Sequence, residues 1–342
     1  MTRASVFVQS PRSVEEAMAV TTATRPAISV SGLRKTFGDK VVLDGIDLMV
    51  TEGTVFSLLG PNGAGKTTMV RILSTLVPAD AGSIRVAGHD LTKQPDGVRA
   101  AIGVTGQFSA VDNLLTGEEN LKLMADLHHL GRTEGRRRTV QLIDRFDLGE
   151  LASKPASVYS GGMRRRLDLA MTLVGDPRLI FLDEPTTGLD PRSRHAMWQI
   201  IRGLVAEGVT VFLTTQYLDE ADQLADRIAL LDHGRIVIEG TPDELKRRIP
   251  GGHILLRFAD PTALHTAART LTVAQRDDVA LTLQIPSDGD VRSLRAVLDR
   301  LDDAHVEVDQ LSIHTPDLDD VFFAFTGTPT PAAAGHDLTE GH

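Results

Sequence analysis

Cysteine is absent from this chain of 342 residues, and so are long apolar runs and an excess of positive charge. Without cysteine, the chain has no disulfide framework, thiol catalysis or cysteine-based metal site, which agrees with a reducing compartment. No apolar run approaches the roughly 18 residues that a membrane span needs, so any contact with a membrane has to pass through a partner protein. The formal net charge is -10. A nucleic-acid binder usually carries a basic footprint, so we expect no nucleic-acid partner.

The length of the chain suggests two or three structural units. Hydrophobic residues make up 42% and charged residues 24% of the sequence, an ordinary balance for a globular protein with a buried core. Residues 1–26 mix charged and small residues and lack the apolar segment of a secretory signal. We expect residues 1–26 to be a disordered extension and the tail at 327–342, rich in Pro, Thr and Ala, to be disordered too.

Residues 60–67 fill every fixed position of the phosphate-binding pattern G-x-x-x-x-G-K-[ST]. Glycines let the backbone wrap closely around a phosphate, and the loop N–H groups and the next helix N-terminus attract anions. An apolar stretch at 54–59 and a helical pattern at 68–73 supply the strand–loop–helix context that the motif requires. A chance match in a glycine-rich turn is the alternative. The expected nucleotide-binding residues of this loop are Gly60, Pro61, Asn62, Gly63, Ala64, Gly65, Lys66, Thr67 and Thr68.

Within this loop, two side chains have distinct expected roles. The Lys66 ammonium group would reach the β- and γ-phosphates of a nucleotide, and the Thr67 hydroxyl would bind Mg²⁺. A second acidic motif follows at 179–184, where an apolar strand ends in Asp183 and Glu184. Asp183 could hold Mg²⁺ directly or through water, and Glu184 could orient or deprotonate the attacking water. Two carboxylates that merely begin a solvated turn are the alternative, which the phosphate loop makes less favourable.

Apolar strands alternate with helical patterns along much of the chain, which indicates an α/β fold with a parallel sheet. Several runs are apolar throughout, as strands buried on both faces require. Residues 108–170 lack β-branched runs and carry helical patterns, so we expect a helical insert there. The expected strands are 27–30 and 41–50, joined by a turn at 37–40, then 54–59, 83–86, 179–182, 209–215 and 228–231.

The pattern breaks at Ile249-Pro250-Gly251-Gly252, so we place one domain at 27–247 and a small α+β domain at 248–326. The expected elements of the second domain are strands at 253–258, 281–285 and 306–313, and helices at 290–301 and 318–325.

Residues 159–163, Tyr-Ser-Gly-Gly-Met, precede a helical pattern at 164–173. A hydroxyl and bare backbone N–H groups at a positive helix end form a second small anion cradle. One nucleotide does not need two cradles from a single chain, whereas two chains packed head to tail would use both. Here the sequence resembles the ATP-binding cassette (ABC) family, whose signature Leu-Ser-Gly-Gly-Gln appears as residues 159–163 just upstream of the Asp183-Glu184 strand. A plain helix N-cap is the alternative.

The resemblance covers residues 27 to about 247 and implies a P-loop NTPase with a RecA-like parallel-sheet core, an antiparallel β edge and a helical subdomain at about 108–170. It implies that ATP and Mg²⁺ are bound between two chains. One complete set of motifs favours two identical chains, and a heterodimer is the alternative. In this family, Phe37 would stack on adenine, although a turn or core aromatic is the alternative. The residues that would contact nucleotide, metal or the partner chain are Gln107, Ser160, Gly161, Gly162 and Asp190, with Gln107 also hinging the helical subdomain.

One position departs from the family pattern, because Gln216 stands where most members have the switch histidine. The glutamine amide can donate a hydrogen bond to the γ-phosphate, but it cannot carry a positive charge. We therefore expect Glu184 and Gln216 to be the catalytic residues. The alternative is that Gln216 simply ends a strand.

Gln216, the segments 104–108 and 114–121, and the ending at 316–322 resemble the daunorubicin-resistance branch of exporter ATPases. This resemblance implies a peripheral subunit on the cytoplasmic face of the membrane. It would pair with a separate multi-span permease and power efflux of antibiotics, other amphipathic compounds or lipids. The C-terminal domain would help the subunits to dimerise or regulate them.

Two other functions remain open from the sequence. The first is a soluble ABC ATPase acting on nucleic acid or ribosomes, although those proteins usually have two cassettes or a long coiled-coil insert. The second is a weakly hydrolysing regulatory nucleotide binder, which Gln216 suggests and Glu184 opposes. The basic run Arg164-Arg165-Arg166 lies on the helix after the signature, where a contact with nucleotide or a partner is possible.

Overall fold

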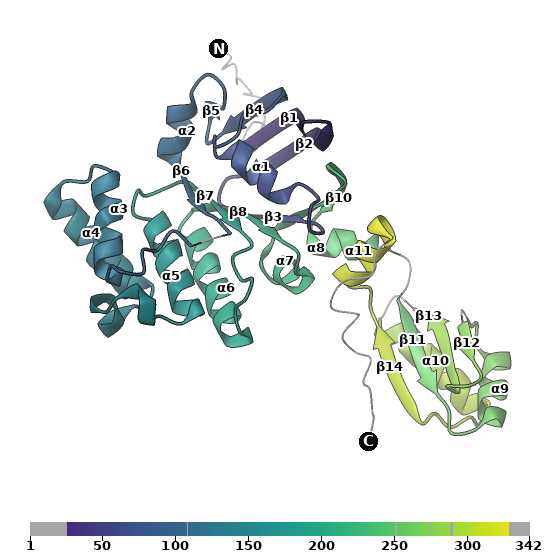
Figure 1. Cartoon of the computed structure of the whole chain (residues 1–342). Coiled ribbons are helices and arrows are strands. Elements are labelled where there is room, and N and C mark those ends of the chain that lie inside the picture. Colours follow the sequence, from purple (N-terminus) through teal and green to yellow (C-terminus); the bar gives the residue numbers. More distant parts are fainter. Residues whose placement is uncertain (1–25, 108, 250–251, 274, 288–289, 328–342) are drawn as a thin grey trace, which may run out of the picture.

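The computed structural model describes residues 26–107, 109–249, 252–273, 275–287 and 290–327. The strands form three sheets, one of six strands and two of four. Figure 1 shows the first two sheets and their helices together and the third sheet set apart from them. The predictions of disorder at the two ends concern residues 1–25 and 328–342, which lie outside the described residues.

The six-stranded sheet has the order β10-β9-β3-β8-β7-β6. Five neighbouring strands are parallel and β10 is antiparallel to β9. Every residue of β3, β7 and β8 is buried, because helices cover both faces of the sheet. The predicted parallel core is therefore confirmed. Its strands are β3 (Val55–Leu59), β6 (Ile102–Thr105), β7 (Leu179–Asp183), β8 (Thr210–Thr215), β9 (Arg227–Asp232) and β10 (Arg235–Gly240).

The first four-stranded sheet is antiparallel and has the order β2-β1-β4-β5. Phe37 pairs with Lys40 at the tip of the β1–β2 hairpin, where the sequence predicted a turn. The sheet shares one apolar cluster with α1, α2 and the six-stranded sheet, which confirms the predicted antiparallel edge. Its elements and the adjoining helices are β1 (Pro26–Phe37), β2 (Lys40–Thr51), β4 (Ala81–Val86), β5 (His89–Asp90), α1 (Lys66–Leu73) and α2 (Pro95–Ala101).

The segment between β6 and β7 is helical, as predicted. A capping box between Thr116 and Glu119 begins α3, since each side chain bonds the backbone N–H of the other residue. Apolar side chains of this segment pack with Trp198 of α6 and with the buried face of the six-stranded sheet. The elements are α3 (Gly117–Leu127), α4 (Arg132–Arg145), two short 3₁₀ turns (Gly149–Ser153 and Ala156–Val158), α5 (Gly161–Thr172) and α6 (Pro191–Ala206).

Two short helices complete this part of the chain, α7 (Leu218–Leu224) after β8 and α8 (Pro242–Arg247) after β10. Thr241 and Glu244 form a capping box at the start of α8, with Pro242 at its first position. We call residues 26–249 the cassette. Among the described residues, no helix combines the length and apolarity needed to cross a bilayer.

The third sheet belongs to a unit with the order β-α-β-β-α-β and the strand order β12-β13-β11-β14. All neighbouring strands are antiparallel, which is the split βαβ, ferredoxin-like arrangement. One sheet face packs its apolar side chains against α9 and α10. The sequence predicted three strands and α10, but it did not predict α9 or β12. The elements are β11 (His253–Arg257), α9 (Pro261–Thr270), β12 (Gln275–Asp277), β13 (Thr282–Pro286), α10 (Val291–Asp303) and β14 (Gln310–His314).

The last helix, α11 (Leu318–Thr326), returns from this unit to the cassette and lies beside α8 (Figure 1). Its buried residues Leu318, Val321 and Phe322 share an apolar cluster with side chains of α7, α8 and β9. The sequence analysis grouped 318–325 with the small C-terminal domain, whereas the structure packs the apolar face of this helix on the cassette. The chain therefore crosses between the two parts twice.

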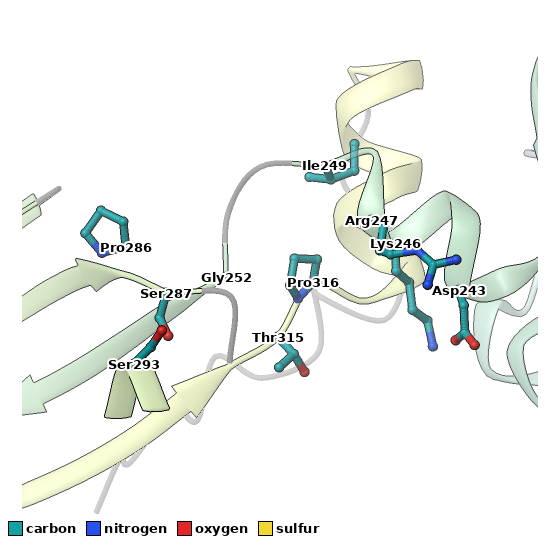
Figure 2. A pocket seen from close by; sticks show the side chains of 10 residues that line it. All are labelled: Asp243, Lys246, Arg247, Ile249, Gly252, Pro286, Ser287, Ser293, Thr315 and Pro316. Atoms are coloured by element: carbon teal, nitrogen blue, oxygen red, sulfur yellow. The ribbon is translucent and has the colours of Figure 1, made fainter. Parts of the chain in front are cut away.

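A cavity of about 760 Å³ lies at these crossings. Figure 2 shows Lys246 and Arg247 of α8 on one side, Pro286 and Ser287 on the other, and Pro316 between them. None of the predicted nucleotide-binding or catalytic residues is among the described residues that line it. The predicted chemistry therefore belongs elsewhere in the molecule.

Candidate nucleotide-binding site

The predicted phosphate loop connects the buried strand β3 to helix α1 at the carboxyl edge of the six-stranded sheet. Two of its glycines are sterically required. A Cβ on Gly60 would lie 2.3 Å from the carbonyl oxygen of Leu231, and a Cβ on Gly65 would lie 2.8 Å from Cδ2 of Leu43. Gly65 also has φ of +115°, a conformation that side chains rarely adopt. The loop therefore folds back tightly against the neighbouring strands.

Lys66 begins α1 and folds its side chain back into the loop, so that only 5% of the residue is exposed. Its Nζ donates to the carbonyl oxygens of Gly60 at 2.7 Å and Pro61 at 3.1 Å. The same nitrogen lies 3.7 Å from Oε1 of Glu184. Burial lowers the pKa of Lys66, while the carboxylates of Glu184 and Asp183 oppose this shift. A cation enclosed in a loop of this kind suits an anionic ligand.

Asp183 and Glu184 lie where β7 ends, next to β8. The Asp183 carboxylate is buried and accepts a hydrogen bond from the Thr214 hydroxyl. Glu184 has φ of +49°, and its N–H donates to the Thr214 carbonyl at 3.1 Å. Positive φ in a non-glycine residue is uncommon and is concentrated at functional sites. This turn brings the Glu184 side chain toward Lys66, where Oε2 also accepts a hydrogen bond from Thr187 at 3.2 Å.

A hollow of about 380 Å³ lies between the phosphate loop, the β1–β2 hairpin and the end of β7. Residues from four separate segments of the sequence line it, and they include eight of the predicted site residues. The lining residues are Lys40, Val42, Asn62, Gly63, Gly65, Lys66, Thr67, Thr68, Gln107 and Glu184.

The donor set of this hollow fits Mg²⁺ shared with a nucleotide. The Thr67 hydroxyl and the Gln107 amide supply the hard oxygen ligands that Mg²⁺ prefers, and Asp183 lies next to Glu184 in the sequence. Within the described ranges, no group of three or more His, Cys, Asp or Glu side chains is arranged to hold a metal. Mg²⁺ in nucleotide sites is bound through one or two carboxylates and completes its shell with water and phosphate, so a site of this kind needs no such group.

Phe37 lies at the tip of the β1–β2 hairpin and is 50% exposed. Its strand partner Lys40 lines the hollow. The Lys35 ammonium nitrogen lies 5.1 Å from the centroid of the Phe37 ring. The ring is therefore outside the core, on a hairpin whose residues Lys40 and Val42 line the hollow, and part of its aromatic surface is accessible.

The predicted signature residues lie at the start of α5. Ser160 caps this helix and accepts a hydrogen bond from the Met163 N–H at 3.3 Å. A Cβ on Gly162 would lie 2.6 Å from Oγ of Ser193, so this glycine is required by close packing against α6. None of Ser160, Gly161 and Gly162 is among the described residues that line the hollow around Lys66. The structure does not bring the two predicted cradles together within one chain.

The remaining predicted residues lie near the same sheet edge. Asp190 caps α6, and its carboxylate accepts hydrogen bonds from the Ser193 N–H at 3.0 Å and hydroxyl at 2.6 Å, which lower the pKa of Asp190. Gln216 is half-buried and follows β8 directly. Because Thr214 of β8 pairs with Asp183 of β7, Gln216 leaves the sheet at the same edge as Glu184. Its predicted contact with a γ-phosphate stays a prediction.

Arg165 is a residue that the sequence analysis named only as part of a basic run. Its side chain is 11% exposed and its guanidinium group contacts the backbone around both Gln107 and Glu184. A triple arginine on a helix does not reveal which member is buried. Its position depends on how α5 packs, and no local sequence signal could have identified it.

The chain is similar to known proteins over most of its length. Residues 43–187 match the ABC transporter family, and residues 240–326 match the DrrA1-3-like ATP-binding protein C-terminal domain. The chain is 49% identical to the daunorubicin resistance ATP-binding protein DrrA3 of Streptomyces coeruleorubidus, over 88% of this chain and 96% of that protein. It is 45% identical to the doxorubicin resistance ATP-binding protein DrrA of Mycobacterium tuberculosis H37Rv, over 89% and 95%. It is 37% identical to the Nod factor export ATP-binding protein I of Ralstonia nicotianae, over 88% and 94%.

Solved structures are similar to the cassette. An ATP-binding subunit of an ABC transporter superposes with a TM-score of 0.59 and 29% identity, covering 65% of this chain and 92% of the other. A dimeric ATP-binding cassette in a post-hydrolysis state, bound to ADP and Pi, superposes with a TM-score of 0.57 and 26% identity, covering 63% and 98%. The shared part is therefore about two thirds of this chain.

Proposed function

Because this chain belongs to the ATP-binding subunits of ABC transporters, in the branch of daunorubicin and doxorubicin resistance proteins, we propose that it binds and hydrolyses ATP to power export through a separate membrane permease. The carrying observation is the hollow in which Lys66 Nζ and Glu184 Oε1 lie 3.7 Å apart. The exported compounds would be drugs, antibiotics, other amphipathic molecules or lipids. The subunit would lie on the cytoplasmic face of the membrane, bound to the permease.

ATP binding would replace the hydrogen-bond acceptors of Lys66. The Lys66 ammonium group now donates to two carbonyls of its own loop, and phosphate oxygens would replace these acceptors. The loop N–H groups and the start of α1 would hold the β-phosphate. The Phe37 ring would stack on adenine, an interaction worth roughly 1–3 kcal/mol per base. Thr67, Gln107 and Asp183 would hold Mg²⁺, which neutralises phosphate charge when bound.

Hydrolysis would use the two residues that leave neighbouring strands at this edge. Glu184 would orient the attacking water and accept its proton, and its strained backbone is fixed by two hydrogen bonds from its N–H to Thr214. Gln216 would donate its amide N–H to the γ-phosphate oxygen as charge develops there. Glutamine stays neutral, so Gln216 would contribute a hydrogen bond without a positive charge.

Two identical chains would sandwich two nucleotides. In each site the phosphate loop would come from one chain and Ser160, Gly161 and Gly162 from its partner. The position of the signature outside its own chain's hollow supports this arrangement. Asp190 would act at the same interface. One complete set of motifs per chain favours a homodimer, and hydrolysis would let the two chains separate.

The experiment that tests this function compares two variants of the full chain. Glu184→Gln keeps the shape of the site but removes the base, so ATP affinity should persist while turnover falls about 10²- to 10⁴-fold. This variant should also accumulate as a dimer with saturating MgATP, measured by light scattering after size exclusion. Lys66→Ala should lose affinity for a fluorescent ATP analogue. The exposed Lys93, which pairs only loosely with Asp90 at 3.9 Å, supplies the control Lys93→Ala.

Two outcomes would contradict the proposal. Unchanged ATP affinity and turnover in Lys66→Ala would exclude the hollow as the nucleotide site. A Glu184→Gln chain that stays monomeric with saturating ATP would exclude the sandwich. Measured turnover in the unmodified chain, with the permease present if activity is low, separates an ATPase from a regulatory nucleotide binder.

A further inference from the structure

The guanidinium group of Arg165 connects helix α5 to both segments that lead into the hollow. It donates to the carbonyl oxygens of Gly106 at 2.9 Å and Pro185 at 2.9 Å. It also donates to the carbonyl oxygens of Asp183 at 3.2 Å and Glu184 at 3.3 Å. All four acceptors are backbone atoms. The group therefore holds the path of the main chain, in addition to its ion pair with Asp168.

Asp168, one turn further along α5, holds Arg165 in place. Its Oδ2 lies 3.3 Å from Nη1 of Arg165. Its Oδ1 accepts the Ala110 N–H at 3.1 Å. Burial raises the pKa of Asp168 and lowers that of Arg165, so desolvation costs both ions. A buried pair of this kind is a weak source of stability, which favours a role in position.

The two segments held by Arg165 carry the side chains that would face the γ-phosphate. Gly106 precedes Gln107, and the Asp183, Glu184 and Pro185 carbonyls surround the strained turn that aims Glu184 at Lys66. A planar fork with five donors spread over three nitrogens can reach carbonyls on two separate segments at once, whereas the three donors of a lysine ammonium group all start from one nitrogen. The residue type is therefore matched to its task of fixing two segments together.

Helix α5 also carries the signature at its N-terminus, because Ser160 is its N-cap. Arg165 lies five residues further, about 7.5 Å along the helix axis at 1.5 Å per residue. Any shift of α5 along or about its axis therefore moves the guanidinium group together with the signature. In the proposed dimer, the signature of one chain contacts the nucleotide of the other site.

We propose that Arg165, held by Asp168, is a positioning residue that couples the two nucleotide sites of the dimer. Nucleotide clamped by Ser160, Gly161 and Gly162 moves α5, and Arg165 passes this movement to Gln107 and Glu184 of the same chain, which act on the other nucleotide. Hydrolysis at each site then depends on occupancy of both. This inference rests on the proposed function and adds a route of communication to it.

The test is a variant that replaces the guanidinium group of Arg165 by an ammonium group and so keeps the positive charge. In Arg165→Lys, kcat for ATP should fall about 10- to 100-fold, since a misplacement near 1 Å costs up to about 10²-fold. Affinity for a fluorescent ATP analogue should stay within about 2-fold, because Arg165 makes no contact with the phosphate loop. The Hill coefficient for ATP hydrolysis should fall from above 1 in the unmodified chain to about 1, as coupling is lost. Asp168→Asn should change both quantities in the same direction.

Arg138→Lys is the matched control. Arg138 also joins a carbonyl and a carboxylate, donating to Leu173 O at 2.9 Å and Asp176 Oδ1 at 2.7 Å, but it does so on α4. This variant should keep the unmodified kcat and Hill coefficient. The double variant Arg165→Lys, Asp168→Asn should lose little more kcat than Arg165→Lys alone, because residues acting as one unit are not additive.

Several results would overturn the inference. One is an unmodified chain with a Hill coefficient of 1, and another is an Arg165→Lys chain with unchanged kcat and cooperativity. A third is an ATP affinity that falls as much as kcat, which would assign Arg165 to folding only. If Arg165→Lys does not fold, the kcat and Hill coefficient of Asp168→Asn decide whether the inference holds. In that variant, amide hydrogen exchange at 103–107 and 183–187 should be faster than in the unmodified chain. Failure here, with Lys66→Ala still losing ATP, leaves the proposed function intact.

Discussion

The cassette and the ferredoxin-like unit use strands in opposite ways. Every residue of β7 in the cassette is buried, whereas four of the five residues of β14 are exposed and the fifth is half-buried. Helices cover both faces of the cassette sheet, and its parallel strands deliver Glu184 and Gln216 to one carboxyl edge. The ferredoxin-like sheet packs helices on one face only. Burial on two faces thus fixes the edge that carries the proposed site, while burial on one face leaves a sheet surface and an edge strand exposed.

Helix α11 complicates this division, because it follows the ferredoxin-like unit in sequence but packs on the cassette. A substitution that removes a buried side chain of α11 should show whether the cassette or the ferredoxin-like unit loses stability.

Phe322→Ala should give the largest effect on stability. Phe322 is 5% exposed, whereas its neighbour Phe323 is 55% exposed, so Phe323→Ala is a matched control. Truncating a buried phenylalanine costs about 3–5 kcal/mol, and a surface change costs within about 0.5 kcal/mol. Trp198, the single tryptophan, lies in α6 of the cassette, so its fluorescence during urea unfolding reports the cassette alone. A Trp198 transition that is equal in both variants would assign α11 to the ferredoxin-like unit.

Gln216→Ala should give the next largest effect, on turnover. A hydrogen bond to a charged group contributes about 1.5–3 kcal/mol, so kcat should fall about 10-fold or more, with KM for ATP changed less. The matched change on the open face of the other sheet is Gln284→Ala in β13, where the residue is half-buried. Steady-state ATPase assays compare the two. An unchanged kcat in Gln216→Ala would remove the γ-phosphate contact from the mechanism.

Glu220→Gln should give the smallest effect, visible as a pH dependence. Glu220 is fully buried on α7, where Oε1 accepts the Trp198 Nε1–H at 3.3 Å, and burial raises its pKa above the usual 4.5. A raised folded-state pKa contributes stability below 4.5 that is lost as pH rises through the folded value. The free energy of unfolding of the unmodified chain, relative to Glu220→Gln, should therefore fall as pH rises from 4.5, by at most about 1.4 kcal/mol per pH unit.

The exposed N-cap residue Asp260 of the ferredoxin-like unit should give a dependence of stability on pH with the opposite sign. Hydrogen bonds from backbone N–H groups at the start of α9 lower the pKa of Asp260. Its contribution is present above the usual 3.8 and is lost as pH falls, so Asp260→Asn should matter least in acid. Urea unfolding from about pH 2.5 to 7 measures both, because the contribution of Asp260 changes only below its usual pKa of 3.8. Equal pH dependence of Glu220→Gln and the unmodified chain would contradict the buried carboxyl argument.

Much of the cassette was predictable because its signals are local. The apolar runs at 179–182 and 209–215 indicate strands buried on both faces, and the loop at 60–67 indicates its own strand–loop–helix context. Helix α9 was missed although Asp260 and Pro261 supply an N-cap and a proline at the first position. Leu264 is the one large apolar residue of that helix, so it lacks the repeated large apolar side chains by which the other helices were recognised.

The features that the sequence did not reveal depend on tertiary packing. Successive helix residues point about 100° apart, so Arg164, Arg165 and Arg166 face different surroundings. Only the docking of α5 directs Arg165 to the backbone carbonyls of the segments that lead into the hollow. Likewise the spacing of Leu318, Val321 and Phe322 predicts a helix with one apolar face, but it does not state which body receives that face. The local sequence pattern therefore predicts the helix, but only the tertiary fold determines which part of the molecule the helix packs against.

The double crossing of the chain has a practical consequence for engineering. Since α11 completes the cassette, the ferredoxin-like unit is topologically an insertion, with 253–314 entering and leaving through neighbouring linkers. A truncation at residue 248 would strip a helix from the cassette and lay bare the apolar surface beneath it. Excising 253–314 and joining the two linkers would instead keep that helix in place. Domain swaps among related transporters should therefore exchange the internal segment 253–314 and keep α11, rather than exchange everything after residue 248.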